Sequence, residues 1–150
     1  MSHSLTDEEK QILLRLARQA VETAVHGKSL PPVEKEALTP TLRENGASFV
    51  TLTIHGELRG CIGALEAYQP LAEDVREHAI AAAMNDPRFS PLTQKELSRT
   101  QIEVSRLTTP QELDYADADD LLKKLRPHVD GVILKHGHRR ATFLPQVWEK

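Results

Sequence analysis

A single thiol lies in a short segment whose residue types suit chemistry. Residues 58–63 read Leu-Arg-Gly-Cys-Ile-Gly, so Arg59 and Cys61 are two positions apart. Residues two apart share one face of a β-strand, and a nearby guanidinium favours the thiolate, the nucleophilic form of cysteine. The spacing gives the hypothesis of a reactive or ligand-binding Cys61 beside an anion-binding Arg59. The structural alternative is a small buried cysteine, with Arg59 paired to a carboxylate such as Asp86 or Glu103.

The same segment contains two glycines where strand-forming residues are expected. Glycine weakens a strand and marks a bulge or the close approach of a ligand or another backbone. Gly60 and Gly63 are therefore candidate ligand-binding positions.

Polar residues in two later segments can add to the same pocket. Asp86 and Arg88 follow an alanine-rich segment, and Arg88 either clamps a phosphate or carboxylate or closes an ion pair with Asp86. Glu103 and Ser105 alternate with apolar residues, so they supply an acid/base group and a hydroxyl to one strand face. Solvated strand positions have the same pattern, and both interpretations stay open.

The sequence predicts no metal site and indicates no cofactor. None of the seven histidines has a zinc-type spacing, and one cysteine leaves a cysteine-based zinc site short of ligands. His136 and His138 flank a glycine, which favours a solvated hairpin. Glycine-rich phosphate loops and a serine nucleophile elbow are absent.

The hydrophobic periodicity predicts the elements that position these residues. Thr6 and Glu9 form a capping box that opens a helix running to Gly27. After the proline-containing loop 28–40, an alternating pattern predicts a strand from Ala47 to Ile54 and a return strand over residues 58–64.

The apolar residues of this hairpin share one face if its loop has three residues. The expected pairs are then Ile54 with Leu58, Thr53 with Arg59, Thr51 with Cys61 and Phe49 with Gly63.

The remaining elements follow the same reasoning. Pro70 opens a second helix that ends at residues 85–87, and residues 101–107 alternate as a third strand. A short helix is expected over 117–125, followed by a hairpin of residues 131–135 and 139–143. Antiparallel strands mixed with helices predict an α+β fold, mostly an antiparallel sheet with flanking helices.

Composition limits the class of protein. With 150 residues and 39% apolar residues, the chain is expected to form a single domain, residues 1–150, around one core. Neither a secretory signal nor a membrane-spanning run is present, and the single cysteine excludes an internal disulfide, so a cytoplasmic location and no membrane association are expected.

The net charge of −3 argues against a general nucleic-acid-binding field. A basic stretch over residues 123–140 follows an acidic stretch over 112–120, and the two are expected to neutralise one another.

Four segments together resemble the AMMECR-type domain family, also called AmmeMemoRadiSam system protein A. They are residues 58–63, the sequence Asp-Pro-Arg-Phe-Ser-Pro-Leu at 86–92, Glu-Val-Ser at 103–105 and Thr-Phe-Leu-Pro-Gln-Val-Trp at 142–148. The resemblance implies an α+β fold with a smaller subdomain and a functional signature that comprises Arg59, Gly60, Cys61 and Gly63. Family members usually continue past the last segment, so this chain is expected to lack a C-terminal segment.

The resemblance also directs the functional hypotheses, since family members are associated with a Memo-like protein and a radical S-adenosylmethionine (SAM) enzyme. The first hypothesis is an accessory or substrate-handling component of such a modification system. The second is an enzyme with Cys61 as nucleophile, Arg59 as electrostatic stabiliser and Glu103 as proton carrier. The third is RNA or nucleotide binding or modification, with residues 123–140 as the binding segment. The sequence does not indicate the reaction, the substrate or the oligomeric state.

Overall fold

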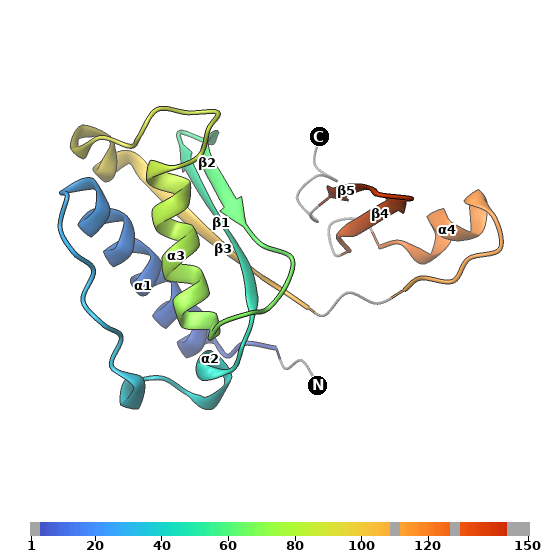
Figure 1. The fold of residues 1–150 in the computed structure, drawn as a ribbon, viewed down its shortest axis with the longest axis horizontal. Coiled ribbons are helices and arrows are strands. Elements are labelled where there is room, and N and C mark those ends of the chain that lie inside the picture. Colours follow the sequence, from blue (N-terminus) through green and yellow to red (C-terminus); the bar gives the residue numbers. More distant parts are fainter. Residues whose placement is uncertain (1–3, 109–111, 127–129, 144–150) are drawn as a thin grey trace. The chain divides into compact units, whose positions relative to one another are not determined.

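A computed structural model describes residues 4–108, 112–126 and 130–143. The chain divides into two compact units, residues 1–109 and 110–150, which are described separately. The first unit contains α1 (Asp7–Val25), the 3₁₀ helix η1 (Lys35–Ala37), α2 (Pro40–Arg43), β1 (Ala47–Ile54), β2 (Glu57–Gly63), α3 (Leu71–Met84), the 3₁₀ helix η2 (Gln94–Arg99) and β3 (Thr100–Leu107). Helices combined with an antiparallel sheet confirm the predicted α+β class (Figure 1).

The predicted capping box starts α1. The Thr6 side chain accepts a hydrogen bond from the Glu9 backbone N–H at 3.1 Å, and the Glu9 carboxylate accepts one from the Thr6 N–H at 3.0 Å. Two otherwise unsatisfied donors of the first turn are thereby paired. Glu9 also accepts a hydrogen bond from the Thr39 hydroxyl, which ties the loop after α1 to the start of that helix.

The predicted loop 28–40 is less irregular than expected. It contains η1, and Pro40 is the first residue of α2, where its fixed φ suits a helical start. These elements are too short to show a hydrophobic period, so the sequence pattern missed them.

The sheet has the order β2-β1-β3, with both pairs antiparallel. The predicted pairs Thr51 with Cys61 and Phe49 with Gly63 are confirmed. The three-residue loop is wrong: the turn contains only His55 and Gly56, both with positive φ, at 52° and 80°. This combination is typical of a type I′ turn, whose twist suits a hairpin.

A β-bulge reconciles the shorter turn with the correct register farther along the hairpin. Thr53 pairs with Leu58 rather than Arg59, and Leu52 pairs with Gly60, so Arg59 is the extra residue on β2. The bulge shifts the faces by one position, which keeps Ile62 on the core side despite the two-residue turn, whereas Leu58, before the bulge, pairs with Thr53 and is exposed.

The core lies between one face of the sheet and the helices α1 and α3 (Figure 1). Its members on β1 are Val50 and Leu52, both with 0% exposure. The α3 face consists largely of alanines, and such small side chains let a helix approach a sheet closely. The buried hydrophobic residues are Leu13, Ala17, Ala20, Val21, Leu42, Ala47, Val50, Leu52, Leu71, Ala72, Val75, Ala79, Ala82, Ala83 and Leu92.

The second unit contains α4 (Ala118–Lys124) and the hairpin of β4 (Val132–His136) and β5 (Arg139–Phe143), close to the predicted ranges. The Asp117 side chain accepts a hydrogen bond from the Asp120 N–H and so caps α4. Residues 144–148 of the C-terminal motif lie outside the described residues.

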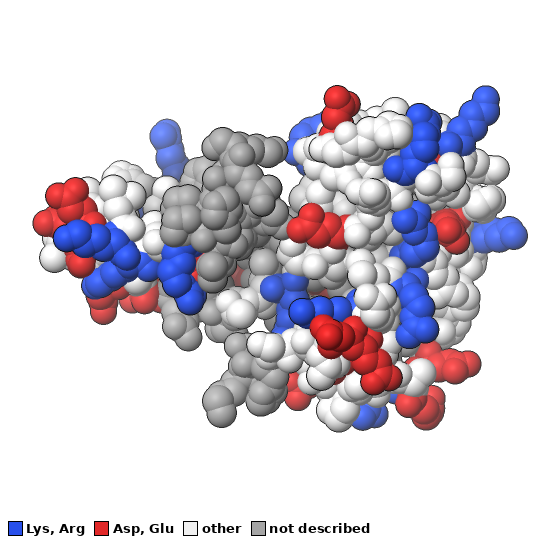
Figure 2. All heavy atoms as spheres, turned by 180° about the vertical axis from the view of Figure 1, so that it is seen from behind, with Lys and Arg blue, Asp and Glu red and all other residues white. Residues whose placement is uncertain are grey.

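Acidic side chains neutralise part of the basic stretch of residues 123–140. Lys124 pairs with Asp120 at 3.2 Å, and Arg126 pairs with Asp130 at 2.8 Å. On the face drawn in Figure 2, acidic and basic side chains are interspersed. In the described part of the chain, no helix combines the length and apolar character needed to cross a bilayer.

Candidate functional site

Cys61 lies on the sheet face opposite α1 and α3. The register places Cys61, Thr51 and Glu103 in one row across the three strands. The next row contains Gly63, Phe49 and Ser105. The sheet therefore brings the predicted residues Cys61, Glu103 and Ser105 to one face.

The Cys61 thiol has a hydroxyl neighbour. The Sγ atom of Cys61 lies 3.3 Å from the Thr51 Oγ1, within hydrogen-bonding distance, and Cys61 is half-buried. Neighbouring strands are about 4.8 Å apart, so the Glu103 backbone is roughly 10 Å from that of Cys61. Glu103 thus shares the row of Cys61, while Thr51 is the direct neighbour of the thiol.

Asp86 and Arg88 hold the backbone of Cys61 at the sheet edge. β2 is an edge strand, so the N–H and C=O of Cys61 that point away from β1 need other partners. The Cys61 N–H donates to the Asp86 Oδ2 at 2.9 Å, and its carbonyl accepts a hydrogen bond from the Arg88 guanidinium at 3.3 Å. At this one residue, Asp86 and Arg88 replace a neighbouring strand; we call these two residues the edge clamp.

The edge clamp is a charge-assisted pair. The Arg88 guanidinium donates to both carboxylate oxygens of Asp86, at 3.0 and 2.8 Å, and the Arg88 backbone N–H adds a third bond at 3.0 Å. The Asp86 side chain is 1% exposed and that of Arg88 is 55% exposed. The pair confirms the ion-pair interpretation of Arg88, because its guanidinium meets Asp86 in two parallel hydrogen bonds.

Hydrogen bonds determine the ionisation of the edge clamp. The bonds from the Arg88 side chain hold the pKa of Asp86 far below its usual range, against the opposing effect of burial. The Asp86 carboxylate is also the main cause of the raised pKa of Arg88, and the charge of Cys61 contributes in the same direction. Arg88 is therefore held as a cation mainly by its buried carboxylate partner.

Arg59 has a different partner from the three that the sequence suggested. Its Nε and Nη2 atoms donate to the carboxylate of Glu96, at 2.9 and 3.1 Å. The side chains of Arg59 and Glu96 are 14% and 20% exposed. The Arg59 hydrogen bonds lower the pKa of Glu96 to about 2.

The position of Arg59 follows from two structural features that the sequence pattern missed. The bulge makes Arg59 the extra residue of β2, and η2 carries Glu96. The guanidinium groups of Arg59 and Arg88 also lie near the Phe89 ring. Their distances from the ring centroid are 5.9 and 5.4 Å. These distances are compatible with cation–π contacts.

Close packing explains why residues 60 and 63 of β2 are glycines. A Cβ atom at Gly60 would lie 2.2 Å from the Ala82 backbone oxygen, so glycine is required where β2 crosses α3. A Cβ atom at Gly63 would lie 2.4 Å from the Phe49 ring and from the Ser48 carbonyl oxygen. Close packing of the chain on itself explains both residues, as glycine in a strand interior often indicates.

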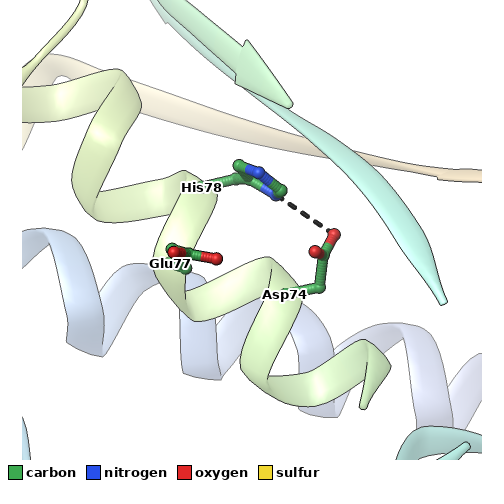
Figure 3. Close-up of side chains that lie close together, drawn as sticks. All are labelled: Asp74, Glu77 and His78. Carbon is green, nitrogen blue, oxygen red and sulfur yellow. Dashed lines mark hydrogen bonds and ion pairs between the residues drawn. The ribbon is translucent and has the colours of Figure 1, made fainter. Parts of the chain in front are cut away.

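A second polar cluster, on α3, was not singled out by the sequence analysis. The Asp74 side chain, which is fully buried, accepts hydrogen bonds from the Ser48 hydroxyl at 2.6 Å and from Gln69 at 3.1 Å, and its Oδ2 lies 3.1 Å from the His78 Nδ1. Figure 3 shows Asp74 and His78 turned toward each other. Glu77 accepts hydrogen bonds of 2.5 Å from Tyr68 and Gln69.

The ligand-type atoms of Asp74, Glu77 and His78 lie within 4.8 Å of one another, which is compact enough to consider a metal ion. The carboxylate oxygens, however, already accept the hydrogen bonds just described. A hydrogen-bonded network that satisfies the buried Asp74 carboxylate explains why these side chains lie together. The i, i+3, i+4 spacing of these residues on a helix was the signal by which the sequence could have shown the cluster.

Glu96 was also missed, although its signal was present. Thr93 and Glu96 have the T-x-x-E spacing of a helix start, and the Glu96 carboxylate accepts hydrogen bonds from the Thr93 N–H and hydroxyl at 3.0 and 3.1 Å. The same carboxylate receives Arg59, so the start of η2 also determines where the Arg59 side chain goes.

Comparison with known proteins identifies similar chains. The AMMECR1 family model matches residues 14–150. A protein from Thermofilum pendens is 41% identical over 95% of this chain and 71% of its own length. A protein from Methanothermobacter thermautotrophicus is 39% identical over 95% of this chain and 74% of its own length.

A solved structure has the same fold. The crystal structure of the uncharacterized protein PH0010 from Pyrococcus horikoshii aligns with a TM-score of 0.83 and 36% identity, over 95% of this chain and 72% of that one. The similarity extends over nearly the whole chain.

Proposed function

The chain belongs to the AMMECR1 family, and from this membership we propose that it is an accessory, substrate-handling component of a modification system. The other components are a Memo-like protein and a radical SAM enzyme. The contact site is the exposed part of the edge clamp together with Cys61.

One observation carries the proposal: the edge clamp fixes Cys61 through its backbone, while the thiol lies beside a hydroxyl group. Both outward backbone groups of Cys61 are bonded to Asp86 and Arg88. Among the described residues, the hydrogen-bond partner of the Sγ atom is the Thr51 hydroxyl. A hydroxyl does not accept a thiol proton at neutral pH, whereas a nucleophilic enzyme activates its nucleophile through a base. A rigidly held thiol of this kind suits presentation to another protein that performs the chemistry.

The half-exposed Arg88 gives the site a charge that a partner can recognise. Its side chain is 55% exposed while its carboxylate partner is buried, so the guanidinium forms the outer surface of the clamp. Arginine is enriched in the residues that dominate protein interfaces.

A co-purification experiment tests this function. The full chain carries a tag and is co-expressed with the Memo-like protein and the radical SAM enzyme. We expect the wild type to retain at least one of them, and Arg88→Gln to lower retention by roughly tenfold or more. Arg15→Gln, at an exposed arginine of α1, is the matched control and should retain the partner fully. Absence of both partners from the wild-type eluate, or equal losses in the two variants, contradicts the proposal.

The contact of the Arg88 guanidinium with the Cys61 carbonyl, at 3.3 Å, favours a second candidate function, a cysteine-dependent enzyme. In that case Arg88 stabilises the thiolate, and Cys61 attacks an electrophilic substrate. Because the chain has one cysteine, its alkylation rate reports on this thiol alone. The enzyme hypothesis requires the rate to level off at a lower pH in the wild type than in Arg88→Gln. Identical pH profiles in the two proteins would exclude thiolate stabilisation by Arg88.

The third hypothesis, RNA or nucleotide binding through residues 123–140, receives no comparable support. Lys124 and Arg126 in that stretch are already engaged with Asp120 and Asp130. Nucleic-acid binding depends on basic side chains that neutralise phosphates and displace their counterions. Side chains already paired with carboxylates do this poorly.

A further inference from the structure

A pocket separate from Cys61 lies at the end of the sheet where β1 turns into β2. Its volume is about 370 Å³, within the range of small-molecule sites. One wall is the hairpin over residues 54–59, and the other is η2. The His55-Gly56 turn, with positive φ at both residues, fixes the backbone at the hairpin end.

The pocket contains an internal pair and two unpaired charges. Arg59 and Glu96 bind each other through two hydrogen bonds and so form a neutral part of the lining. Glu57 and Arg99 also line the pocket, and both are exposed. Neither of these two has a hydrogen-bond or ion-pair partner in the part of the chain that the structure describes. The lining therefore offers one free anion and one free cation.

The sheet register keeps these two charges apart. Glu57 on β2 pairs with Ile54 on β1, and Ile54 pairs with Thr100 on β3, the residue after Arg99. With strands about 4.8 Å apart, the backbones of Glu57 and Arg99 are separated by roughly 10 Å. Two long side chains that reach into this gap can contact a cationic and an anionic group of one small molecule.

Two apolar residues, Ile54 and Leu58, also line the pocket. Ile54 is half-buried, and Leu58 is 39% exposed. A ligand that covers these residues removes apolar surface from water, which favours binding.

We infer that this pocket binds a free α-amino acid with an apolar side chain. The Arg99 guanidinium receives the carboxylate, the Glu57 carboxylate receives the ammonium group, and the side chain lies over Ile54 and Leu58. A ligand with one charge would leave either Glu57 or Arg99 without a partner. This inference goes beyond the proposed function, since it involves neither Cys61 nor the edge clamp.

Three probes with the same side chain separate the contributions of the two charged groups. The full chain labelled with nitrogen-15 is titrated at millimolar concentrations with L-leucine, with N-acetyl-leucine, which lacks the ammonium group, and with leucinamide, which lacks the carboxylate. L-leucine should shift the amide signals of residues 54–59 and 94–99. The two other probes should bind about tenfold more weakly, because each loses one charge-assisted contact.

Matched variants assign the charges. Arg99→Gln should weaken L-leucine binding about tenfold and leave leucinamide binding unchanged. Glu57→Gln should weaken L-leucine binding and leave N-acetyl-leucine binding unchanged. Arg15→Gln, at an exposed arginine outside the pocket, should bind like the wild type.

Several outcomes would overturn the inference. They are the absence of shifts with L-leucine, equal affinities for the three probes, and equal effects of Arg99→Gln and Arg15→Gln. Signal shifts confined to residues outside the hairpin and η2 would also contradict it. Because the co-purification experiment uses different residues, either proposal can fail while the other stands.

Discussion

The backbone N–H of Cys61 donates a hydrogen bond of 2.9 Å to the side chain of Asp86, 25 residues away in sequence. This bond joins the segment that carries the thiol to the segment that follows α3. The buried Asp86 carboxylate completes the hydrogen bonding of β2 there, and its pKa is lowered mainly by the Arg88 side chain and further by this bond.

Replacing Asp86 with Asn should destabilise the first unit. The amide loses the charge that pairs with Arg88, and its NH₂ group cannot accept hydrogen bonds. The free energy of unfolding should fall by about 1–3 kcal/mol. The loss is not larger because water can solvate the half-exposed Arg88 once its partner is gone. Urea unfolding measures the change, and Glu66→Gln, at an exposed carboxylate, is the control. A loss no larger than that of the control would show that the clamp does not contribute to stability.

The pair of Arg59 and Glu96 should make stability depend on acid pH. The hydrogen bonds from Arg59 lower the pKa of Glu96 to about 2 in the folded state, against about 4.3 in an unfolded chain. This stabilisation is fully present above pH 4.3 and is lost as the pH falls from 4.3 through 2. Its size is roughly 1–2 kcal/mol for a partly solvated pair.

Urea unfolding of the wild type and Glu96→Gln at several pH values isolates this contribution. The difference between the two free energies of unfolding should shrink between pH 5 and pH 2. A difference that stays constant over this range would mean that Glu96 titrates alike in the folded and unfolded chains.

Tyr68 should ionise unusually late. The hydrogen bond to Glu77 is the main cause that raises its pKa to about 12. The absorbance of tyrosinate follows the titration, and Tyr115→Phe leaves Tyr68 as the remaining tyrosine. In that background Glu77→Gln should move the Tyr68 pKa downward, toward the usual value of about 10. Circular dichroism over the same pH range verifies that the chain stays folded. An unchanged midpoint after Glu77→Gln would refute the role of this hydrogen bond.

Gly60→Ala should be strongly destabilising. The new Cβ atom would lie 2.2 Å from the Ala82 carbonyl oxygen, so β2 and α3 must separate. Overpacking of this kind costs typically about 1–3 kcal/mol. Because the clash involves a backbone oxygen, adding Ala82→Gly should not restore stability. Thermal unfolding of the single and double variants distinguishes the cases, and full rescue by the second substitution would show that the clash lies with the Ala82 side chain instead.

Much of the fold was predictable because its signals lie within short stretches of sequence. The capping box at Thr6 and Glu9 and the helical period after it predicted α1, and alternation predicted β1 and β3. The pairs of Thr51 with Cys61 and Phe49 with Gly63 followed from the rule that apolar residues share one face. The order of four motifs was sufficient to recognise the family that the comparisons confirm.

The hairpin turn shows where this reasoning stops. A two-residue turn combined with a bulge at Arg59 gives the same faces beyond the bulge as a three-residue turn without one. Patterning depends only on the faces, so it could not distinguish the two. The choice follows from turn twist and from packing around Arg59, which alternation does not describe.

The sequence by itself therefore determined the family, the helices α1, α3 and α4, the strands and the face of the sheet on which Cys61 lies. Only the tertiary structure decided that Arg59 pairs with Glu96, that Asp86 and Arg88 hold the Cys61 backbone, and that Asp74 is satisfied by Ser48, Gln69 and His78. The physical reason is range. Propensity and periodicity act over a few neighbouring residues, whereas a buried charge takes whichever partner the packing of distant segments brings within hydrogen-bonding distance.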